Sequence, residues 1–360
     1  MNLIITYKKK FFIKRIEICS LLKNIILIII IYFYIYIFLI NNEEIPQFKF
    51  YEVKSFYPNA NNFDLNYKKK NCRNIFKYKP NNEKDLVILA YEFQNKSLEH
   101  NLFMELSIEK VLNSYRNSIP FAHLICFVPK KSIKTKIVSI LKKYEIEIII
   151  IPNSKEHIAN RRFIESYNYL KKNKHYYQRV LLIDLKDIFI FGDIFATIGE
   201  NDLFVNYNCN KESQNLENCT KFFNSVNKKW FNQNINNYNT NKNEFNKFID
   251  IKPITIIVGV FIGSIKNFFK FIEIFSHKLI EFNNKNQMDN FGYEQVLFNF
   301  LFYLGYFKKS NLKAIGCEQR MCFRPKNLLF NKKTTKFFYE NSRCSPILIH
   351  KYFPNSWISK

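Results

Sequence analysis

Short apolar runs alternate with stretches of helical periodicity from Asp85 to Asp184, and this alternation constrains the fold more than any other feature of the chain. The strand candidates are continuously apolar, which is typical of strands buried on both faces of a sheet. Between them, apolar residues recur every three or four positions, as on one face of a helix. The strand candidates cover 86–90, 121–128, 146–151 and the run that ends at Asp184. The pattern predicts an α/β fold with a mostly parallel sheet flanked by helices.

The second half of the chain continues this pattern after a polar interruption. The stretch 209–246 is rich in asparagine and predicts a long excursion or a lid. The apolar run 254–262 begins just after Pro253 and is too short to span a bilayer, so we expect a core strand there. Helical periodicity follows at 265–282 and at 293–303.

Composition and missing motifs exclude several functions. The sequence has no Gly-x-Gly-x-x-Gly and no Walker motif, so neither a dinucleotide-cofactor enzyme nor a P-loop NTPase is supported. The formal net charge of +25 would suit a nucleic-acid partner. However, the lysines are spread over the whole chain, and no nucleic-acid-binding motif accompanies them. We therefore expect no nucleic acid among the partners.

The N-terminus predicts a membrane anchor. A basic segment at 1–23 precedes an apolar run at 24–40, and no small-residue cleavage site follows, so we expect an uncleaved signal anchor. Positive charge before the run and acidic residues after it predict a cytoplasmic tail at 1–23 and a single-pass type II topology. The polar stretch 41–83 is then a stem and 84–360 a lumenal domain. The short span suits a Golgi or endoplasmic reticulum membrane.

Cysteine usage agrees with a lumenal domain. All cysteines except Cys19 follow the predicted anchor, where an oxidising lumen favours disulfides. Their odd number leaves at least one thiol unpaired, and we expect it to be Cys126, which lies inside an apolar strand candidate. No second close pair of cysteines or histidines completes a zinc site. Asn95 and Asn218 stand in Asn-x-Ser/Thr sequences and predict glycans.

Two carboxylates, Asp184 and Asp187, stand at the exit of a buried strand. A carboxylate is costly to desolvate unless it is paired or bound to a cation. Strand ends in open α/β sheets are also where ligand crevices form. The pair therefore suits a hard divalent cation that also binds substrate phosphates. A turn in which one aspartate caps the next element is the plainer interpretation, and these residues alone leave both open.

Further motifs follow the acid pair in a recognisable order. Asp184-Leu185-Lys186-Asp187 is followed by Asp193-Ile194-Phe195, by Val258-Gly259-Val260-Phe261-Ile262-Gly263, by Glu294-Gln295-Val296-Leu297-Phe298-Asn299, and by His350 after an apolar run. In this order the chain resembles eukaryotic GT-A-fold glycosyltransferases, which are type II membrane proteins that use a nucleotide sugar. The resemblance covers the chain from about Asp85 onward and implies a GT-A-like catalytic domain.

The resemblance also implies a role for each matched residue. Asp184, Asp187 and His350 would hold Mn²⁺ or Mg²⁺ against the charge of the departing diphosphate, and imidazole suits Mn²⁺ better than Mg²⁺. The other matched residues would contact the substrates: Arg161, Arg162, Gly259 and Gly263 at the nucleotide-sugar donor, Glu294 as the base for the acceptor hydroxyl, and Gln295 at a sugar.

Each of these residues also has a plainer interpretation. His350 suits an exposed strand end, the glycines suit tight packing in a core strand, and one of the two arginines suits a solvated helix face. Glu294 suits the positive end of a helix dipole, and Gln295 suits a solvent-facing position.

We expect a metal-dependent glycosyltransferase of hexosyltransferase type that acts in the secretory pathway. It would transfer a sugar from a nucleotide-sugar donor to a glycan, protein or lipid acceptor. Three departures from the family pattern leave a second interpretation open: Ile257-Val258 replaces an asparagine, Glu294 replaces an aspartate, and Ile194 replaces a proline. An inactive, membrane-tethered binding protein with the same scaffold would tolerate all three.

Overall fold

The computed structural model describes residues 72, 75–93, 97–209, 216, 219–223, 227, 229–231, 242–283, 287–325, 328–331, 336–339, 342 and 344–351. All of them belong to one compact unit, Tyr51–Lys360. The predicted tail, the anchor at 24–40, most of the stem, and the acceptor residues Asn95 and Asn218 lie outside the described residues. Among the residues that are described, no helix combines the length and the apolar character needed to cross a bilayer.

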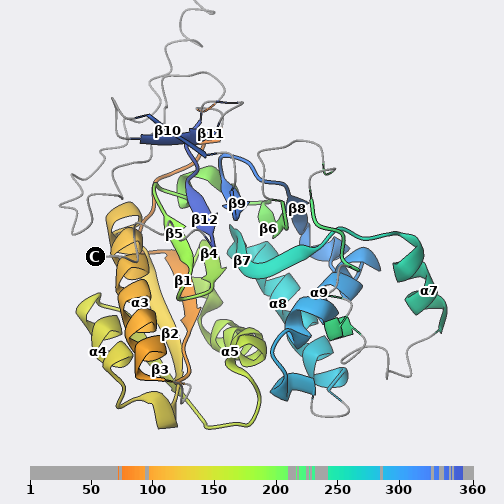
Figure 1. Ribbon diagram of the computed structural model, residues 1–360, viewed down its shortest axis with the longest axis horizontal. Helices are drawn as coiled ribbons and strands as arrows, with labels where there is room; N and C mark the ends of the chain where they lie inside the picture. Colours follow the sequence, from red (N-terminus) through yellow and green to blue (C-terminus); the bar gives the residue numbers. More distant parts are fainter. Residues whose placement is uncertain are drawn as a thin grey trace, which may run out of the picture. The chain divides into compact units, whose positions relative to one another are not determined.

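A seven-stranded sheet forms the centre of the domain, in the order β3-β2-β1-β4-β7-β6-β8 (Figure 1). Its strands are β1 (Asp85–Ala90), β2 (His123–Pro129), β3 (Glu147–Ile151), β4 (Arg179–Ile183), β6 (Leu203–Tyr207), β7 (Ile256–Ser264) and β8 (Lys313–Ile315). The first four are parallel, β7 is antiparallel to both β4 and β6, and β6 is parallel to β8. The prediction of an α/β fold with a mostly parallel sheet is therefore confirmed.

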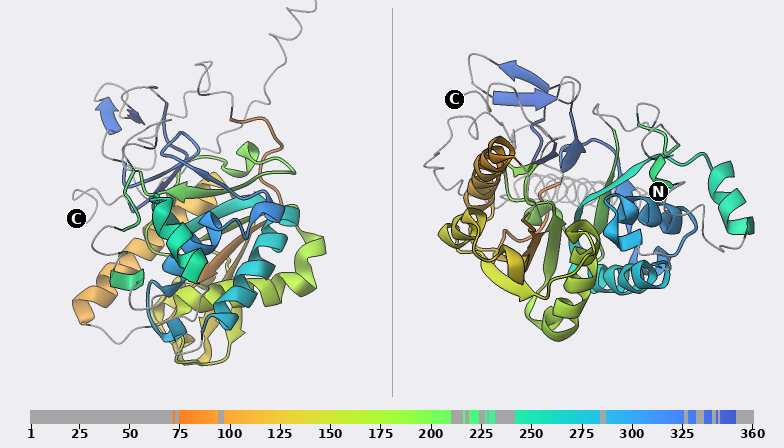
Figure 2. Two further views of the ribbon diagram at one scale, coloured as in Figure 1. Left: turned by 90° about the vertical axis from the view of Figure 1, so that its right-hand side faces the viewer. Right: turned by 60° about the horizontal axis from the view of Figure 1, so that its bottom comes forward.

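Helices cover both faces of this sheet (Figure 2). They are α3 (Leu98–Ser118), α4 (Lys136–Lys143), α5 (Ile158–Asn173), α8 (Ile265–Glu281) and α9 (Tyr293–Tyr303), and α7 (Lys242–Asp250) lies farther out. Helices α3 and α4 pack together on one side, whereas α5, α8 and α9 pack together on the other. The core beneath α8 is built from interlocking phenylalanines, with Phe271 contacting the rings of Phe261, Phe298 and Phe307. These large buried rings fix α8 and α9 against β7.

A second, three-stranded sheet brings the C-terminal part of the chain to the acid pair. It consists of β5 (Ile188–Ile190), β12 (Leu348–His350) and β9 (Met321–Phe323), with β12 in the middle. Strand β12 is antiparallel to β5 and parallel to β9. A separate hairpin pairs β10 (Leu328–Asn331) with β11 (Lys336–Tyr339). Because β5 starts directly after Asp187, the strand that pairs with it also reaches the acid pair.

Three disulfides connect the described parts of the domain: Cys72–Cys344, Cys209–Cys219 and Cys317–Cys322. Cys126 is buried and free, which confirms the prediction for this thiol. The Cys72–Cys344 bond ties the end of the segment predicted as a stem to the region just before β12. Arg179 adds a second tie, since its guanidinium binds both oxygens of Asp85 and the carbonyl of Pro80. The last residues of that segment therefore pack on the domain.

Candidate functional site

The acid pair lies in the short connection between the two sheets. Asp184 is the first residue after β4, and Asp187 is the last before β5. The Asp184 amide donates a hydrogen bond to the carbonyl of Gly259 (3.0 Å), which continues the pairing of β4 with β7. On the other side, the hydroxyl of Ser107 on α3 donates to the carbonyl of Lys186 (2.6 Å). The connection is therefore held from both sides at the carboxyl edge of the parallel strands.

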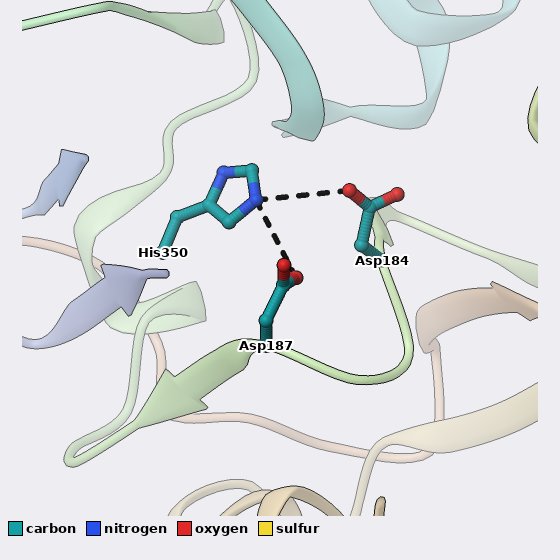
Figure 3. Close-up of side chains that lie close together, drawn as sticks. All are labelled: Asp184, Asp187 and His350. Carbon is teal, nitrogen blue, oxygen red and sulfur yellow. Dashed lines mark ion pairs between the residues drawn. The ribbon is translucent and has the colours of Figure 1, made fainter. Parts of the chain in front are cut away.

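Strand pairing delivers His350 to the same place. His350 pairs with Ile188 across β12 and β5, and the next amide, that of Lys351, donates to the carbonyl of Asp187 (2.7 Å). As a result, the imidazole points between the two carboxylates (Figure 3). Its Nε2 lies 3.7 Å from Asp184 Oδ2 and 3.5 Å from Asp187 Oδ1. One ligand atom from each of the three residues falls within 4.8 Å of the other two.

Two members of this triad, Asp187 and His350, carry buried polar atoms that are not satisfied by protein partners. His350 and Asp187 side chains are 2% and 5% exposed, whereas that of Asp184 is 30% exposed. Both ring nitrogens of His350 and Oδ1 of Asp187 lack a hydrogen-bond partner among the residues that the structure describes. Unsatisfied buried polar atoms cost about 1–3 kcal/mol each. A cation bound by these atoms would remove that cost.

The charge states of the triad also suit a cation. Burial lowers the pKa of the His350 imidazole, against the opposing effect of Asp187. Burial alone would raise the pKa of the Asp187 carboxyl, but nearby His350, Lys351 and Lys186 outweigh it and hold this pKa below its usual range. A neutral imidazole and an ionised carboxylate are the forms that bind metals. Two carboxylates and one imidazole fit Mg²⁺ or Mn²⁺, and the imidazole favours Mn²⁺.

The absence of a side chain at Gly259 leaves space for His350 and Asp184. A Cβ atom at this position would collide with Cε1 of His350, and it would lie 2.7 Å from Asp184 Oδ2 and 3.0 Å from His350 Nδ1. No larger residue fits unless the candidate ligands move. The other glycine of the matched motif, Gly263, lies at the opposite end of β7, where it pairs with Val180. Its nearest atoms belong to Asp202 and Leu203, so the structure gives Gly263 the plainer role of tight strand packing.

The two neighbouring arginines of α5 separate in space. The guanidinium of Arg162 donates to Asp184 Oδ1 and to the carbonyl of Val258 (2.9 Å for the second), and it lines the site. Burial lowers the pKa of Arg162 to about 10, which leaves the group protonated at neutral pH. Arg161 instead pairs with Glu165 (3.1 Å) and Glu156 (3.8 Å), and it contacts no member of the triad.

Glu294 and Gln295 lie in the first turn of α9, but only Glu294 has a side-chain oxygen without a hydrogen-bond partner among the described residues. The Glu294 side chain is buried, and its Oε2 has no hydrogen-bond partner in the described part of the chain. Burial raises the pKa of this carboxyl, and the charge of Arg162 opposes the shift. The Gln295 amide, by contrast, donates to the carbonyl of Ile256 and accepts from the amide of Val258 (3.2 Å). Both ends of Gln295 therefore support the backbone of β7.

Two clefts meet at the triad, and both are lined by Arg162, Asp184, Phe291 and Lys351. The first cleft lies between the end of β1 and α3, and the second lies between β7, α9 and the ends of β9 and β12. Including their open mouths, they hold about 970 and 1030 Å³ of empty space. Lining residues of the first include Tyr91, Phe93, Asn101, Met104 and Lys186, and those of the second include Trp230, Gly259, Glu294, Arg324 and His350.

Several residues at the site were not predicted from the sequence, among them Arg324, Lys351 and Asn160. Arg324 and Lys351 directly follow the parallel strands β9 and β12, both with positive φ (49° and 59°), and they add two cationic side chains to the second cleft. Lys351 could have been predicted as a site residue, because it directly follows His350 in the sequence. Asn160 is fully buried on α5, and it donates to the carbonyls of Met288 (2.7 Å) and Asn290 (2.9 Å). Nothing in the sequence around Asn160 pointed to this contact.

No protein-family model matches the sequence, and no curated protein matches it. Among solved structures, the chain is similar to the glycosyltransferase GlyE of Streptococcus pneumoniae TIGR4, with 16% identity and a TM-score of 0.34. The match covers 65% of this chain and 45% of GlyE. A TM-score this low does not establish a shared fold.

Proposed function

We propose that this chain is a metal-dependent glycosyltransferase with a GT-A-like domain that uses a nucleotide-sugar donor. The observation that carries the proposal is the arrangement of Asp184, Asp187 and His350, whose candidate ligand atoms converge where two clefts meet. Those of Asp187 and His350 are buried and have no hydrogen-bond partner among the described residues. Transfer of a sugar from a nucleotide sugar expels a diphosphate, and its growing negative charge needs compensation. A carboxylate–imidazole site between two clefts suits that reaction, because donor and acceptor must meet at one point.

The neighbouring residues supply the other requirements of the reaction. When bound by the triad, Mn²⁺ or Mg²⁺ would act as a Lewis acid toward the diphosphate oxygens. Arg162 fixes the orientation of Asp184, and Arg324 and Lys351 bring positive charge to the second cleft, where an anionic leaving group needs it. Glu294 is the carboxylate placed to accept the proton of an acceptor hydroxyl, if the reaction inverts the anomeric centre. A raised pKa suits a general base that works near neutral pH.

We further propose the secretory pathway as the compartment, with a single membrane anchor at 24–40 and the described domain in the lumen of the Golgi or endoplasmic reticulum. The basic segment before the apolar run supports this orientation. Three disulfides also support it, since such bonds persist in oxidising compartments. The acceptor would be a glycan, a glycoprotein or a glycolipid.

An inactive binding protein is the second candidate, and one observation favours it. Ile257 and Val258 line the second cleft at the point where the family pattern has an asparagine, so an apolar wall replaces a polar contact to the donor or acceptor. The triad would still bind a metal and a nucleotide in such a protein, but no sugar would be transferred.

Calorimetry on the full chain tests both candidates. We expect uridine or guanosine diphosphate to bind only when Mn²⁺ or Mg²⁺ is present, and the double variant Asp184→Asn/Asp187→Asn to lose this binding. Glu83→Gln/Asp250→Asn is the matched control, because it removes two exposed carboxyls away from the triad. Unchanged binding by the aspartate variant would overturn the metal role. Binding without release of free nucleotide from any donor in a panel of nucleotide sugars would favour the inactive protein.

A further inference from the structure

An exposed aromatic ring stands at the junction of the two clefts. Phe291 is 56% exposed, although it lines both clefts beside the metal triad. Its ring makes T-shaped contacts with His157 (centroids 5.2 Å apart) and with Trp230 (5.6 Å). A single exposed apolar side chain is common on protein surfaces. This ring, however, contacts two other rings and lies where two clefts meet, and aromatic side chains that line a cleft are typical of ligand sites.

The backbone that carries Phe291 is firmly held. The buried amide of Asn160 binds the carbonyls of Met288 and Asn290 before the ring, and its oxygen accepts from the amide of Glu294 after it (3.0 Å). Next to Phe291, Gly292 has a φ of 88°, and the indole of Trp230 occupies the space that a Cβ atom would need, with its nearest ring carbon at 2.7 Å. The exposure of Phe291 is therefore a feature of an ordered surface.

This ring lies on the same cleft as the candidate base. Phe291 and Glu294 are three residues apart, and both line the second cleft together with Trp230. Cationic groups from Arg324 and Lys351 line the same cleft. The cleft thus combines aromatic rings with polar groups beside a carboxylate that can take a proton.

A pyranose has the complementary chemistry. One face of many pyranose rings presents C–H groups that pack on an aromatic ring, whereas the hydroxyls at the ring edge require polar partners. A lipid tail would need a continuous apolar wall, and an extended peptide would need backbone partners, and neither requirement matches this mixture of rings and charges.

We propose that Phe291, supported by Trp230 and His157, is a stacking platform for a pyranose ring of the acceptor, so that the acceptor is a glycan. The proposal rests on the proposed glycosyltransferase function and narrows its acceptor to one whose reacting group is a hydroxyl of a sugar ring, whether that glycan is free or attached to a protein or lipid. A sugar stacked on Phe291 directs an edge hydroxyl toward Glu294 in the same cleft. Phe291 then determines acceptor specificity, and Asn160 is the residue that positions it.

Two measurements on the full chain, in a detergent without a sugar headgroup, test the platform. The sequence has two tryptophans, so Trp357→Phe leaves Trp230 as the sole tryptophan reporter beside Phe291. We expect at least one of methyl β-galactopyranoside, methyl β-N-acetylglucosaminide and methyl α-mannopyranoside to change this fluorescence saturably in the millimolar range, and glycerol not to do so. Saturation-transfer NMR should then show the strongest transfer to the C–H protons of one face of that sugar.

Variants decide whether the ring is responsible. In NMR titrations, Phe291→Ala should weaken binding of that methyl glycoside by about tenfold or more. Phe291→Tyr keeps an aromatic ring and should bind it as the wild type does. Tyr176→Ala is the matched control, since Tyr176 is 63% exposed and its ring contacts that of His175 away from both clefts. No saturable response to any glycoside, or equal affinity in Phe291→Ala, would overturn the platform. Metal-dependent nucleotide binding by the wild-type chain is a separate readout. If the wild type binds a glycoside but no nucleotide, the proposed function is overturned. If it binds the nucleotide but no glycoside, only the platform is overturned.

Discussion

Replacing Gly259 by alanine is the most direct perturbation of the proposed metal site. The backbone at Gly259 is not left-handed, so alanine meets no conformational penalty there. The added methyl would instead collide with the His350 ring and crowd Asp184 Oδ2, which lies 2.7 Å from the ideal Cβ position. At least one of the two candidate ligands must therefore shift, because the hydrogen bond from the Asp184 amide to the carbonyl of Gly259 holds the strand backbone in place.

The size of the effect follows from this crowding. Overpacking a tightly packed position costs about 1–3 kcal/mol of stability. Displacement of groups that orient metal ligands lowers metal affinity by about 10- to 100-fold, which corresponds to about 1.4–2.8 kcal/mol. We therefore expect Gly259→Ala to remain folded and to bind Mn²⁺ at least about tenfold more weakly.

Electron paramagnetic resonance of free Mn²⁺ during a titration of the full chain measures this affinity. Gly263→Ala is the matched control on the same strand: its Cβ would lie against the backbone of Asp202 and Leu203, so it should lower stability without changing Mn²⁺ affinity. In a His350→Ala background, Gly259→Ala should have a smaller effect on affinity than in the wild type, because one of the two groups that it crowds is gone and only Asp184 Oδ2 remains. Wild-type Mn²⁺ affinity in a folded Gly259→Ala variant would refute the geometry proposed for the triad.

Two further predictions concern the candidate base and the longest disulfide. Because burial raises the pKa of Glu294 and only the ionised carboxylate accepts a proton, turnover should increase as the pH rises through this pKa. Glu294→Gln should lower kcat by about 10²- to 10⁴-fold and remove this dependence, as measured by initial rates of nucleotide release; an unchanged pH profile would exclude Glu294 as the base. Cys72→Ser/Cys344→Ser should lower the free energy of unfolding by about 2–5 kcal/mol, because it opens a link across 272 positions. Cys317→Ser/Cys322→Ser, which opens a link across 5 positions, should cost less in the same denaturant titration, and the reverse order would contradict this loop-length argument.

The sequence predicted the sheet and the position of the two aspartates for the same physical reason. Buried parallel strands have continuous apolar runs, and their carboxyl ends meet at one edge, so acids placed directly after such a run can be located without a structure. The fold and the placement of Asp184 and Asp187 followed from this rule. His350 was found only through the order of motifs, since its approach depends on the pairing of β12 with β5, far apart in the sequence.

The remaining residues depended on register and packing, which one sequence does not encode locally. Arg161 and Arg162 are neighbours on a helix and therefore point in directions about 100° apart, and only the packing of α5 against the sheet decides which of them reaches Asp184. Gly259 and Gly263 occur in one motif, but four positions along a strand correspond to about 13 Å. The antiparallel register therefore places Gly259 beside Asp184 and Gly263 beside Val180.

The three candidate ligands of the triad come from two different sheets. Asp184 is held by β4 and β7 of the large sheet, whereas Asp187 and His350 are held by β5 and β12 of the small one. The separation of the ligands is therefore set by how the two sheets pack, and the connection 184–187 links them. The Ser107 hydroxyl fixes this connection to α3, and Arg162 fixes its first residue to the carbonyl of Val258 in β7. Substitutions at Ser107 or Arg162 should thus alter metal affinity without removing a ligand, which distinguishes a site assembled between sheets from one carried by a single loop.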